Sequence, residues 1–185
     1  MNMHMRAVFA IVLIGVLSSI VSVGVALAAD AAEIDVKVDT TLAEFKKEIT
    51  GGAQFLNRAK GVLVFPDVIK AGLVVGGEYG TGALRIGGKS VQYYNIASAS
   101  FGFQIGAQQY AIVMVFLNDE ALKKFRDSQG WEAGVDGSIA IAEWGAGKDI
   151  NTHNFKDPIV GFVLSNKGLM AGISLDGSKL SKIKK

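Results

Sequence analysis

Residues 71–117, with the sequence AGLVVGGEYGTGALRIGGKSVQYYNIASASFGFQIGAQQYAIVMVFL, decide the fold. Val, Ile, Phe and Tyr are mixed there with many glycines, which is typical of strands joined by tight turns and of close backbone contacts. Turn signals occur at Gly76-Gly77, Gly80-Thr81-Gly82 and Gly87-Gly88-Lys89. The stretch therefore predicts four or five short antiparallel strands with some bulges.

Strand signals also flank this stretch. Gly61–Phe65 (GVLVF) predicts a short buried strand that ends at Pro66-Asp67. A later signal covers Gly134–Ala142, and Ile159–Leu164 is predicted to form a hairpin with Leu169–Leu175. Asp176-Gly177 then predicts a turn into a basic tail, which contains Lys179, Lys182, Lys184 and Lys185.

Two helices are predicted. The first covers Thr41–Asn57, where apolar residues recur at helical spacing, with Thr40 or Thr41 as its cap and Glu44 as the capping-box partner of Thr41. Gly51-Gly52 weakens this helix and predicts a kink or a split. The second helix covers Asn118–Gln129, is capped by Asn118 or Asp119, and turns Leu122 and Phe125 towards the core.

These elements predict an α+β fold. A strongly bent antiparallel sheet, either open or closed into a small barrel, packs with two or more helices. The chain has 185 residues, a length that favours one domain, and we expect that domain to span residues 29–185.

The first 28 residues resemble a secretory signal. Met1 to Arg6 carries one firm positive charge, Ala7 to Val25 is almost entirely apolar, and Ala26-Leu27-Ala28 has the small-x-small pattern of a cleavage site. We expect cleavage after Ala28 or Ala29 and a mature domain in the periplasm or secreted, with a peripheral place on a membrane as a further option. The alternative is an uncleaved anchor, since about 20 apolar residues suffice to span a bilayer.

The composition argues against several classes of protein. Half of the residues are hydrophobic and 19% are charged, which argues against disorder. Cysteine is absent, so the sequence has no disulfide, no thiol nucleophile and no cysteine-based metal site. A net charge of +2 does not indicate a nucleic-acid partner. Attraction to anionic surfaces would therefore require local clusters of basic residues.

Four ordered blocks resemble the SYLF-domain family and cover nearly all of the expected mature chain: Ala59–Leu84 (AKGVLVFPDVIKAGLVVGGEYGTGAL), Ser98–Gln108 (SASFGFQIGAQ), Gly134–Ala142 (GVDGSIAIA) and Asn166–Ser178 (NKGLMAGISLDGS). The resemblance implies a lipid-binding module without catalytic residues. It also identifies structural motif positions, which are Gly61, Pro66, Gly72, Gly76, Gly77, Gly80, Gly82, Gly102, Gly106, Gly134, Gly168 and Gly177.

The chain departs from the eukaryotic members of that family at two places. They have a Trp-Ser-x-Pro-type sequence where this chain has Tyr93–Ala97, and a Gly-Pro-x-Gly turn where it has Glu143–Gly147. Some eukaryotic relatives bind phosphoinositides, and some bind and bundle actin. The departures resemble the bacterial, exported branch and argue against actin as a partner.

Basic residues are the candidate lipid-binding groups. They lie around the first helix and strand and in the last positions of the chain: Lys46, Lys47, Arg58, Lys60, Lys70, Lys182, Lys184 and Lys185. Near an anionic membrane each contributes about 1 kcal/mol. We expect alanine at Lys46, Lys47, Arg58 and Lys60 to weaken binding more than truncation after Ser181, because a helix holds its charges in a fixed array whereas a flexible tail loses entropy on binding.

Catalytic and cofactor signals are weak. Gly76–Gly82 lacks the order of a dinucleotide fingerprint and no helix is predicted after it, so a closely packed glycine-rich strand pair is favoured. His153 is a lone loop histidine, which predicts neither a metal site nor a serine triad. An acid–base pair across strands could be built from four carboxylates, but the favoured interpretation is that they are turn and surface groups: Glu78, Asp136, Glu143 and Asp149. No cofactor is expected.

The sequence thus predicts an exported module that binds anionic phospholipid membranes. The alternative is a structural envelope protein or a small outer-membrane-associated barrel without catalytic activity; short strands interrupted by glycines and helices argue against the barrel. An enzyme of unknown class is the third hypothesis, and an activity screen of Glu78, Asp136 and His153 variants would test it.

Overall fold

The computed structural model describes residues 30–72, 75–101, 106–142, 156–165, 168–170 and 173–185. The chain divides into two compact units, Met1–Asp30 and Ala31–Lys185, and the fold below is that of the second unit. The predicted signal at residues 1–28 lies outside the described residues. So do Gly102, Glu143, Asp149 and His153.

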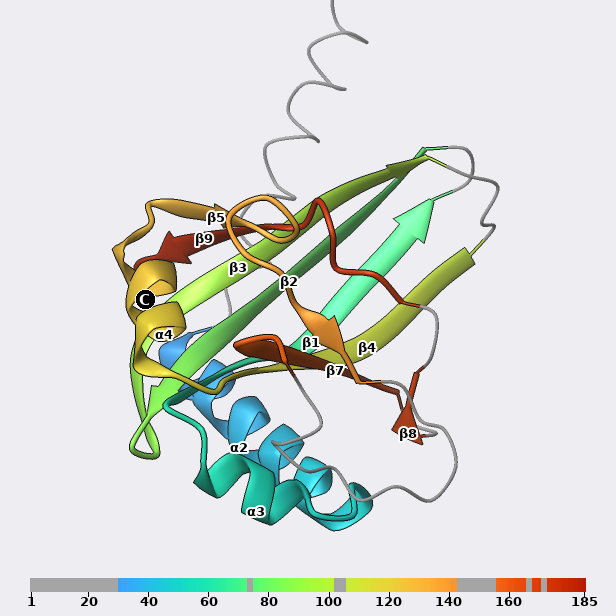
Figure 1. Cartoon of the computed structure of the whole chain (residues 1–185). Coiled ribbons are helices and arrows are strands. Elements are labelled where there is room, and N and C mark those ends of the chain that lie inside the picture. Colours follow the sequence, from blue (N-terminus) through green and yellow to red (C-terminus); the bar gives the residue numbers. More distant parts are fainter. Residues whose placement is uncertain (1–29, 73–74, 102–105, 143–155, 166–167, 171–172) are drawn as a thin grey trace, which may run out of the picture. The chain divides into compact units, whose positions relative to one another are not determined.

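The described strands form one curled sheet of nine strands, in the order β5-β9-β3-β2-β1-β4-β7-β6, with β8 paired to β7 (Figure 1). All strand pairs are antiparallel except β6 with β7. The predicted α+β class and the strong bend are confirmed. Of the two forms expected for the sheet, the described strands adopt the open one, a half-barrel with β5 and β6 at its ends. The bounds are β1 (Gly61–Gly72), β2 (Val75–Ile86), β3 (Lys89–Phe101), β4 (Gly106–Phe116), β5 (Gly130–Glu132), β6 (Ala140–Ile141), β7 (Ile159–Ser165), β8 (Gly168–Leu169) and β9 (Lys179–Ile183).

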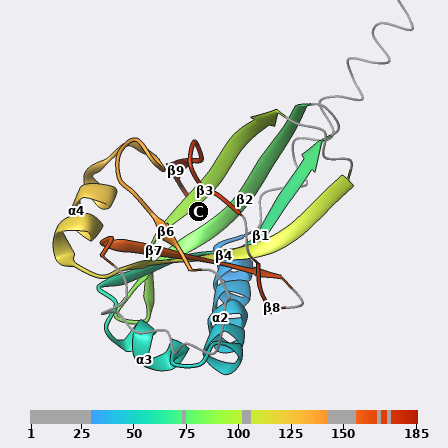
Figure 2. The ribbon, with the colours of Figure 1, turned by 45° about the vertical axis from the view of Figure 1, so that its right-hand side comes forward.

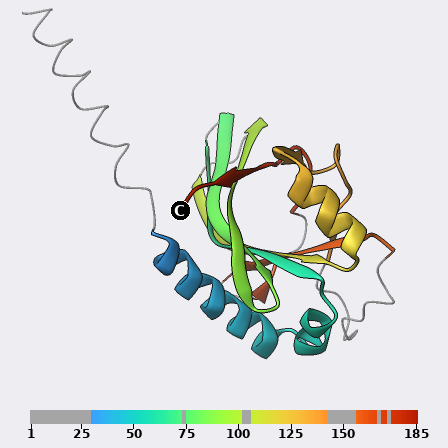
Figure 3. The same ribbon diagram turned by 90° about the vertical axis from the view of Figure 1, so that its left-hand side faces the viewer.

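Helices cover both faces of the half-barrel. Helices α2 (Ala31–Glu48) and α3 (Gly52–Asn57) lie on the convex face, whereas α4 (Asp119–Asp127) lies on the concave side (Figure 3). On the convex face the rings of Phe45 and Phe55 pack edge-on against Phe162 of β7, at 4.9 and 5.4 Å. On the concave side Leu122 and Phe125 of α4 join the main core, as predicted for the second helix. The sheet is therefore buried on both sides over the length that the helices cover.

The first predicted helix was placed too far along the chain. Helix α2 begins ten residues earlier, at Ala31, so Thr40 and Thr41 lie in its interior. Their hydroxyls donate to the carbonyl oxygens of Val36 and Lys37, at 3.0 and 2.9 Å, and do not cap a helix. Serine and threonine bond back to the preceding turn in this way when they sit inside a helix. The split at Gly51-Gly52 is confirmed, since Gly51 adopts φ 79° and a new helix starts at Gly52.

The second predicted helix is confirmed almost to its ends. Helix α4 spans Asp119–Asp127, and the Asn118 side chain accepts a hydrogen bond from the Ala121 backbone N–H at 2.8 Å. A side-chain acceptor at this position satisfies one of the free N–H groups of the first turn. Of the two residues that the sequence offered as the cap, Asn118 and Asp119, the structure uses Asn118.

Pro66-Asp67 does not end the first strand, contrary to the prediction. Strand β1 continues to Gly72, and its register shifts between Val64 and Asp67 against β2 and between Phe65 and Val68 against β4. A bulge accommodates proline, which has no N–H to donate to the ladder. The strand therefore bends at this point and extends beyond the helices (Figure 2).

Two of the three predicted glycine turns are also wrong. Only Gly87 and Gly88, with φ 58° and 80°, form a turn, whereas Gly76–Gly82 lies within the long strand β2. After the end of β1, the described residues of this region thus form three long strands in place of four or five short ones. Gly80 and Gly82 serve close packing: an added Cβ would lie 2.8 Å from the Asp67 carbonyl oxygen or 2.0 Å from that of Val64. The favoured interpretation as a glycine-rich strand pair is confirmed.

The last third of the chain is less regular than predicted. Between Gly134 and Ala142 only Ala140–Ile141 forms a strand. Among the described residues of the hairpin after Ile159, the strand pairs are Leu164–Leu169 and Ser165–Gly168. The turn at Asp176-Gly177 is confirmed, with φ 77° at Gly177. The first part of the predicted basic tail, Lys179–Ile183, is instead strand β9, which pairs with both β3 and β5.

Polar contacts attach α2 to the sheet. Asp35 accepts hydrogen bonds from Ser90 Oγ at 2.6 Å and from Tyr93 Oη at 3.1 Å, and Arg85 Nη2 reaches Asp39 Oδ1 at 2.8 Å. These contacts fix the helix against the start of β3. No helix within the described residues combines the length and the apolar character that a membrane span requires.

Candidate functional site

The structure separates the basic residues that the sequence grouped together. Lys46 and Lys47 are exposed in the last turn of α2, and Arg58 is exposed at the end of α3, on the convex side. Lys70 lies near the far end of β1, opposite Glu78 and Gln108. Ten residues of extended chain place it roughly 30 Å from Lys60. These residues therefore do not form one array.

Two of the predicted residues contact helix α4, one at each end. Lys60 Nζ lies 3.4 Å from Asp119 Oδ2 at the first turn of α4. Lys182, from β9, donates through Nζ to the Arg126 carbonyl oxygen at 2.6 Å, at the last turn. Lys184 and Lys185 are exposed just beyond β9. The argument that a flexible tail loses entropy on binding does not apply to Lys182, because β9 holds its backbone in the sheet.

A groove of about 440 Å³ lies between α4 and the start of β3. Its cationic side chains are Lys123 and Arg126 of α4 and Lys182 of β9; its carboxylates are Asp119 and Asp127. Each carboxylate is paired with a lysine, Asp119 with Lys60 and Asp127 with Lys123. Within the described residues, Arg126 and Lys182 form no ion pair with a carboxylate. The groove is therefore positive overall and suited to an anionic group.

Tyr94 lines the same groove from β3. Its side chain is only 2% exposed, and its hydroxyl has no hydrogen-bond partner among the described residues. Burial raises the pKa of Tyr94 to about 12, and the charge of Arg126 acts in the opposite direction. A buried hydroxyl without a partner is costly. The groove thus combines positive charge with an unsatisfied donor.

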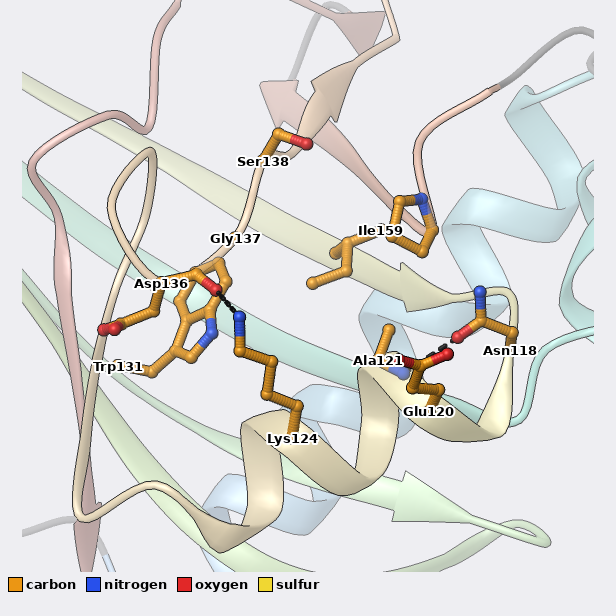
Figure 4. Close-up of a pocket in the computed structure, with 10 residues that line it drawn as sticks. Asn118, Glu120, Ala121, Lys124, Trp131, Asp136, Gly137, Ser138 and Ile159 are labelled. Atoms are coloured by element: carbon orange, nitrogen blue, oxygen red, sulfur yellow. Dashed lines mark hydrogen bonds between the residues drawn. The ribbon is translucent and has the colours of Figure 1, made fainter.

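A second, smaller pocket of about 220 Å³ lies on the other side of α4 (Figure 4). Trp131 forms one wall, and the ammonium of Lys124 reaches over it to donate to the Asp136 carbonyl oxygen at 2.6 Å. Gly137 lies against the indole, where a Cβ would come within 2.9 Å of Trp131 Cζ2. Lys124 is the one cation among the described residues that line this pocket, which also holds the carboxylates of Glu120 and Asp136, so the pocket is less positive than the groove.

Glu78 is buried, which corrects its interpretation as a turn or surface carboxylate. Its side chain is 6% exposed, and Oε2 accepts a hydrogen bond from Tyr110 Oη at 2.6 Å. Burial, together with this contact, raises the pKa of Tyr110 well above its usual range. Asp136 is partly buried and accepts from the Glu132 backbone N–H at 2.8 Å. Each of these two carboxylates therefore has a structural role in the chain.

Sequence reasoning missed Lys123, Arg126 and Tyr94. The spacing of Lys123 and Arg126, three residues apart on a predicted helix, places them on one face and is visible in the sequence. Their proximity to Lys182 is not visible, because it depends on the pairing of β9 with β3 that sets Lys182 opposite Tyr94.

Residues 97–185 match the family model for Ysc84, which is described as "Las17-binding protein actin regulator". The matched segment includes α4 and β9, and therefore all three cations of the groove. It begins shortly after Tyr94.

Known proteins resemble a larger part of the chain. The rat "SH3 domain-containing YSC84-like protein 1" is 30% identical over 133 residues, and the human protein of that name is 29% identical over the same length. The Xenopus laevis protein of that name is 28% identical over 128 residues. The rat and human alignments cover 69% of this chain but only 39% of the relatives, so the chain spans about two fifths of their length.

Proposed function

Because this chain belongs to the Ysc84 (SYLF) family, we propose that it is an exported module that binds anionic phospholipid membranes through the groove beside α4. The family is one of non-catalytic binding domains associated with lipid and actin, which agrees with the expectation that the chain is not an enzyme. The observation that carries the proposal is the convergence of Lys123, Arg126 and Lys182 on one groove.

Electrostatics limits how such a module attaches. Once the signal and its Arg6 are removed, the remaining charge is close to neutral, so long-range attraction by net charge is negligible. Binding must come from the local cluster, at about 1 kcal/mol for each basic residue near an anionic surface. Such attraction is screened as the Debye length falls from about 10 Å at 0.1 M salt to about 3 Å at 1 M.

Vesicle flotation tests the proposal. We expect the protein to float with vesicles that contain anionic phospholipid, and to float weakly or not at all with phosphatidylcholine alone. Raising the salt to 1 M should release it. Flotation that is indifferent to headgroup charge and to salt would refute electrostatic binding, and an apolar lipid pocket would then become the leading account.

Actin regulation is part of the description of the family, but we do not extend it to this chain. The sequence departs from eukaryotic members at Tyr93–Ala97, and this segment lies in β3 beside the groove. Lipid is therefore the partner that we propose.

Export is the second part of the proposal. We expect the cell to remove the first 28 residues, or 29 if the cut follows Ala29, because Ala26-Leu27-Ala28 follows a long apolar stretch. The intact mass of protein recovered from the periplasm or the medium measures this directly. Recovery of the full-length chain alone, embedded in the inner membrane, would favour the uncleaved anchor.

A further inference from the structure

Tyr94 lines the groove, and its ring is held in a fixed position by its neighbours. The ring packs against Phe125 of α4 with centroids 5.0 Å apart, and its cross-strand neighbours are Gly82 of β2 and Lys182 of β9. Since the ring is 2% exposed and held by the core, the hydroxyl cannot turn outwards to water. Such a donor gains the most from an acceptor that is brought to it.

Arg126 lines the same groove as Tyr94, and its positive charge opposes the rise in the pKa of Tyr94 that burial causes. Within the described part of the chain, its guanidinium makes no hydrogen bond or ion pair with another side chain. Lys182, directly opposite Tyr94 in the β3–β9 ladder, places its ammonium at the Arg126 carbonyl oxygen. Tyr94, Arg126 and Lys182 thus all line one groove, and together they offer a hydroxyl, a planar fork of donors and an ammonium.

We propose that this groove recognises a phosphomonoester, with one phosphate oxygen accepting from the Tyr94 hydroxyl and the others facing Arg126 and Lys182. The proposal rests on the function proposed above and deepens it. A terminal phosphate carries about −1.5 to −2 charge and three strong acceptor oxygens. A phosphodiester headgroup carries one charge and two such oxygens, so it cannot satisfy all of these donors equally well.

Access to the hydroxyl requires side-chain movement, because the oxygen itself is covered. Arg126 is exposed on the last turn of α4 and is the group that we expect to swing aside and then close over the phosphate. Bidentate contact with phosphate oxygens is the geometry that guanidinium groups favour. The carboxylates of the groove stay paired with Lys60 and Lys123.

The test compares Tyr94→Phe with Tyr93→Phe. The first removes a hydroxyl that has no partner among the described residues, whereas the second removes one that donates to Asp35 on the opposite face of the strand. Both variants keep every charge. The full protein, purified as the cell produces it, is floated with vesicles of phosphatidic acid or of phosphatidylglycerol in phosphatidylcholine, matched for zeta potential. The N-terminal segment is the same in every variant, so any contribution that it makes to vesicle binding is equal in all of them.

We expect the unaltered protein to prefer phosphatidic acid by at least fivefold. Tyr94→Phe should abolish that preference with no loss of melting temperature, and Tyr93→Phe should keep the preference. Equal binding to the two lipids by the unaltered protein, or an unchanged preference in Tyr94→Phe, would overturn the phosphomonoester site and leave the proposed membrane function standing. Absence of binding to both anionic lipids would overturn the membrane function itself.

A second experiment, without membranes, tests whether the ligand is a lipid headgroup or a soluble phosphate compound. Calorimetric titration with glycerol 3-phosphate, with glycerol as the control, measures the site without a membrane. If glycerol 3-phosphate binds with an affinity that Tyr94→Phe reduces while vesicles do not bind, the phosphomonoester site stands and its ligand is soluble. If phosphatidic acid vesicles bind and this binding depends on Tyr94, the membrane is the source.

Discussion

Replacement of Gly82 by alanine is expected to lower the free energy of unfolding by more than about 4 kcal/mol, a loss that few single substitutions reach. A Cβ at this position would lie 2.0 Å from the Val64 carbonyl oxygen and 2.8 Å from Phe65 Cδ1. Two of the three nearest atoms are backbone atoms of β1, which cannot rotate away as the end of a side chain can. The strands must separate, and the β1–β2 ladder lies at the centre of the sheet.

The bulge in β1 explains why this glycine is needed. Val64 pairs with Ala83 and the next pair is Asp67 with Thr81, so Phe65 and Pro66 face Gly82 across the shift in register. The extra residue presses the Val64 carbonyl into the space that a side chain would fill. A variant with any side chain at this position is expected to lose the bend as well as the ladder.

Gly77→Ala is the matched control, because Gly77 lies in the same strand, is exposed, and its nearest atom would be 3.7 Å away. Its free energy of unfolding should change by no more than about 0.5 kcal/mol. Urea unfolding, followed by circular dichroism, measures both variants. If Gly82→Ala unfolds at the same urea concentration as Gly77→Ala, the close approach of β1 to β2 is wrong.

The second large effect concerns membrane binding. We expect alanine at Lys123, Arg126 and Lys182 together to reduce affinity for anionic vesicles by at least tenfold. Three basic residues near the surface contribute about 3 kcal/mol at most, and the change also leaves Asp127 without its lysine partner. Flotation over a range of lipid concentrations gives the affinity of each variant.

The control variant carries alanine at Lys46, Lys47 and Arg58. It removes the same number of positive charges from the convex side of the domain, so any effect of net charge alone is equal in the two variants. We expect it to retain most of the binding. If the control loses as much affinity as the groove variant, the membrane is bound by overall charge or by the α2–α3 end, and the groove is not the site.

Local sequence patterns correctly predicted the structural features that depend only on residues close together in the chain. The cap at Asn118, the core positions Leu122 and Phe125, the break at Gly51 and the turn at Gly87-Gly88 are set within a few residues of chain. The bent α+β sheet also followed from the many glycines among β-forming residues. These features are short-range, so propensity and capping suffice to predict them.

The ends of the long elements were not predictable in the same way. Pro66 is a strand breaker by propensity, yet β1 continues through it because β2 and β4 pair with it on both sides. Gly76–Gly82 has the composition of turns, yet the close approach of Val64 and Asp67 requires glycine in a strand. Pairing between distant segments overrides local preference in such cases.

By itself, therefore, the sequence determined the family resemblance, the α+β class and the presence of scattered basic residues. The tertiary structure alone decided which of those residues act together. Lys182 joins Lys123 and Arg126 because β9 pairs with β3 and α4 packs over Tyr94, whereas Lys70 is carried away along β1. Charges cooperate only over distances of about a Debye length, and the fold sets those distances between residues that are far apart in the chain.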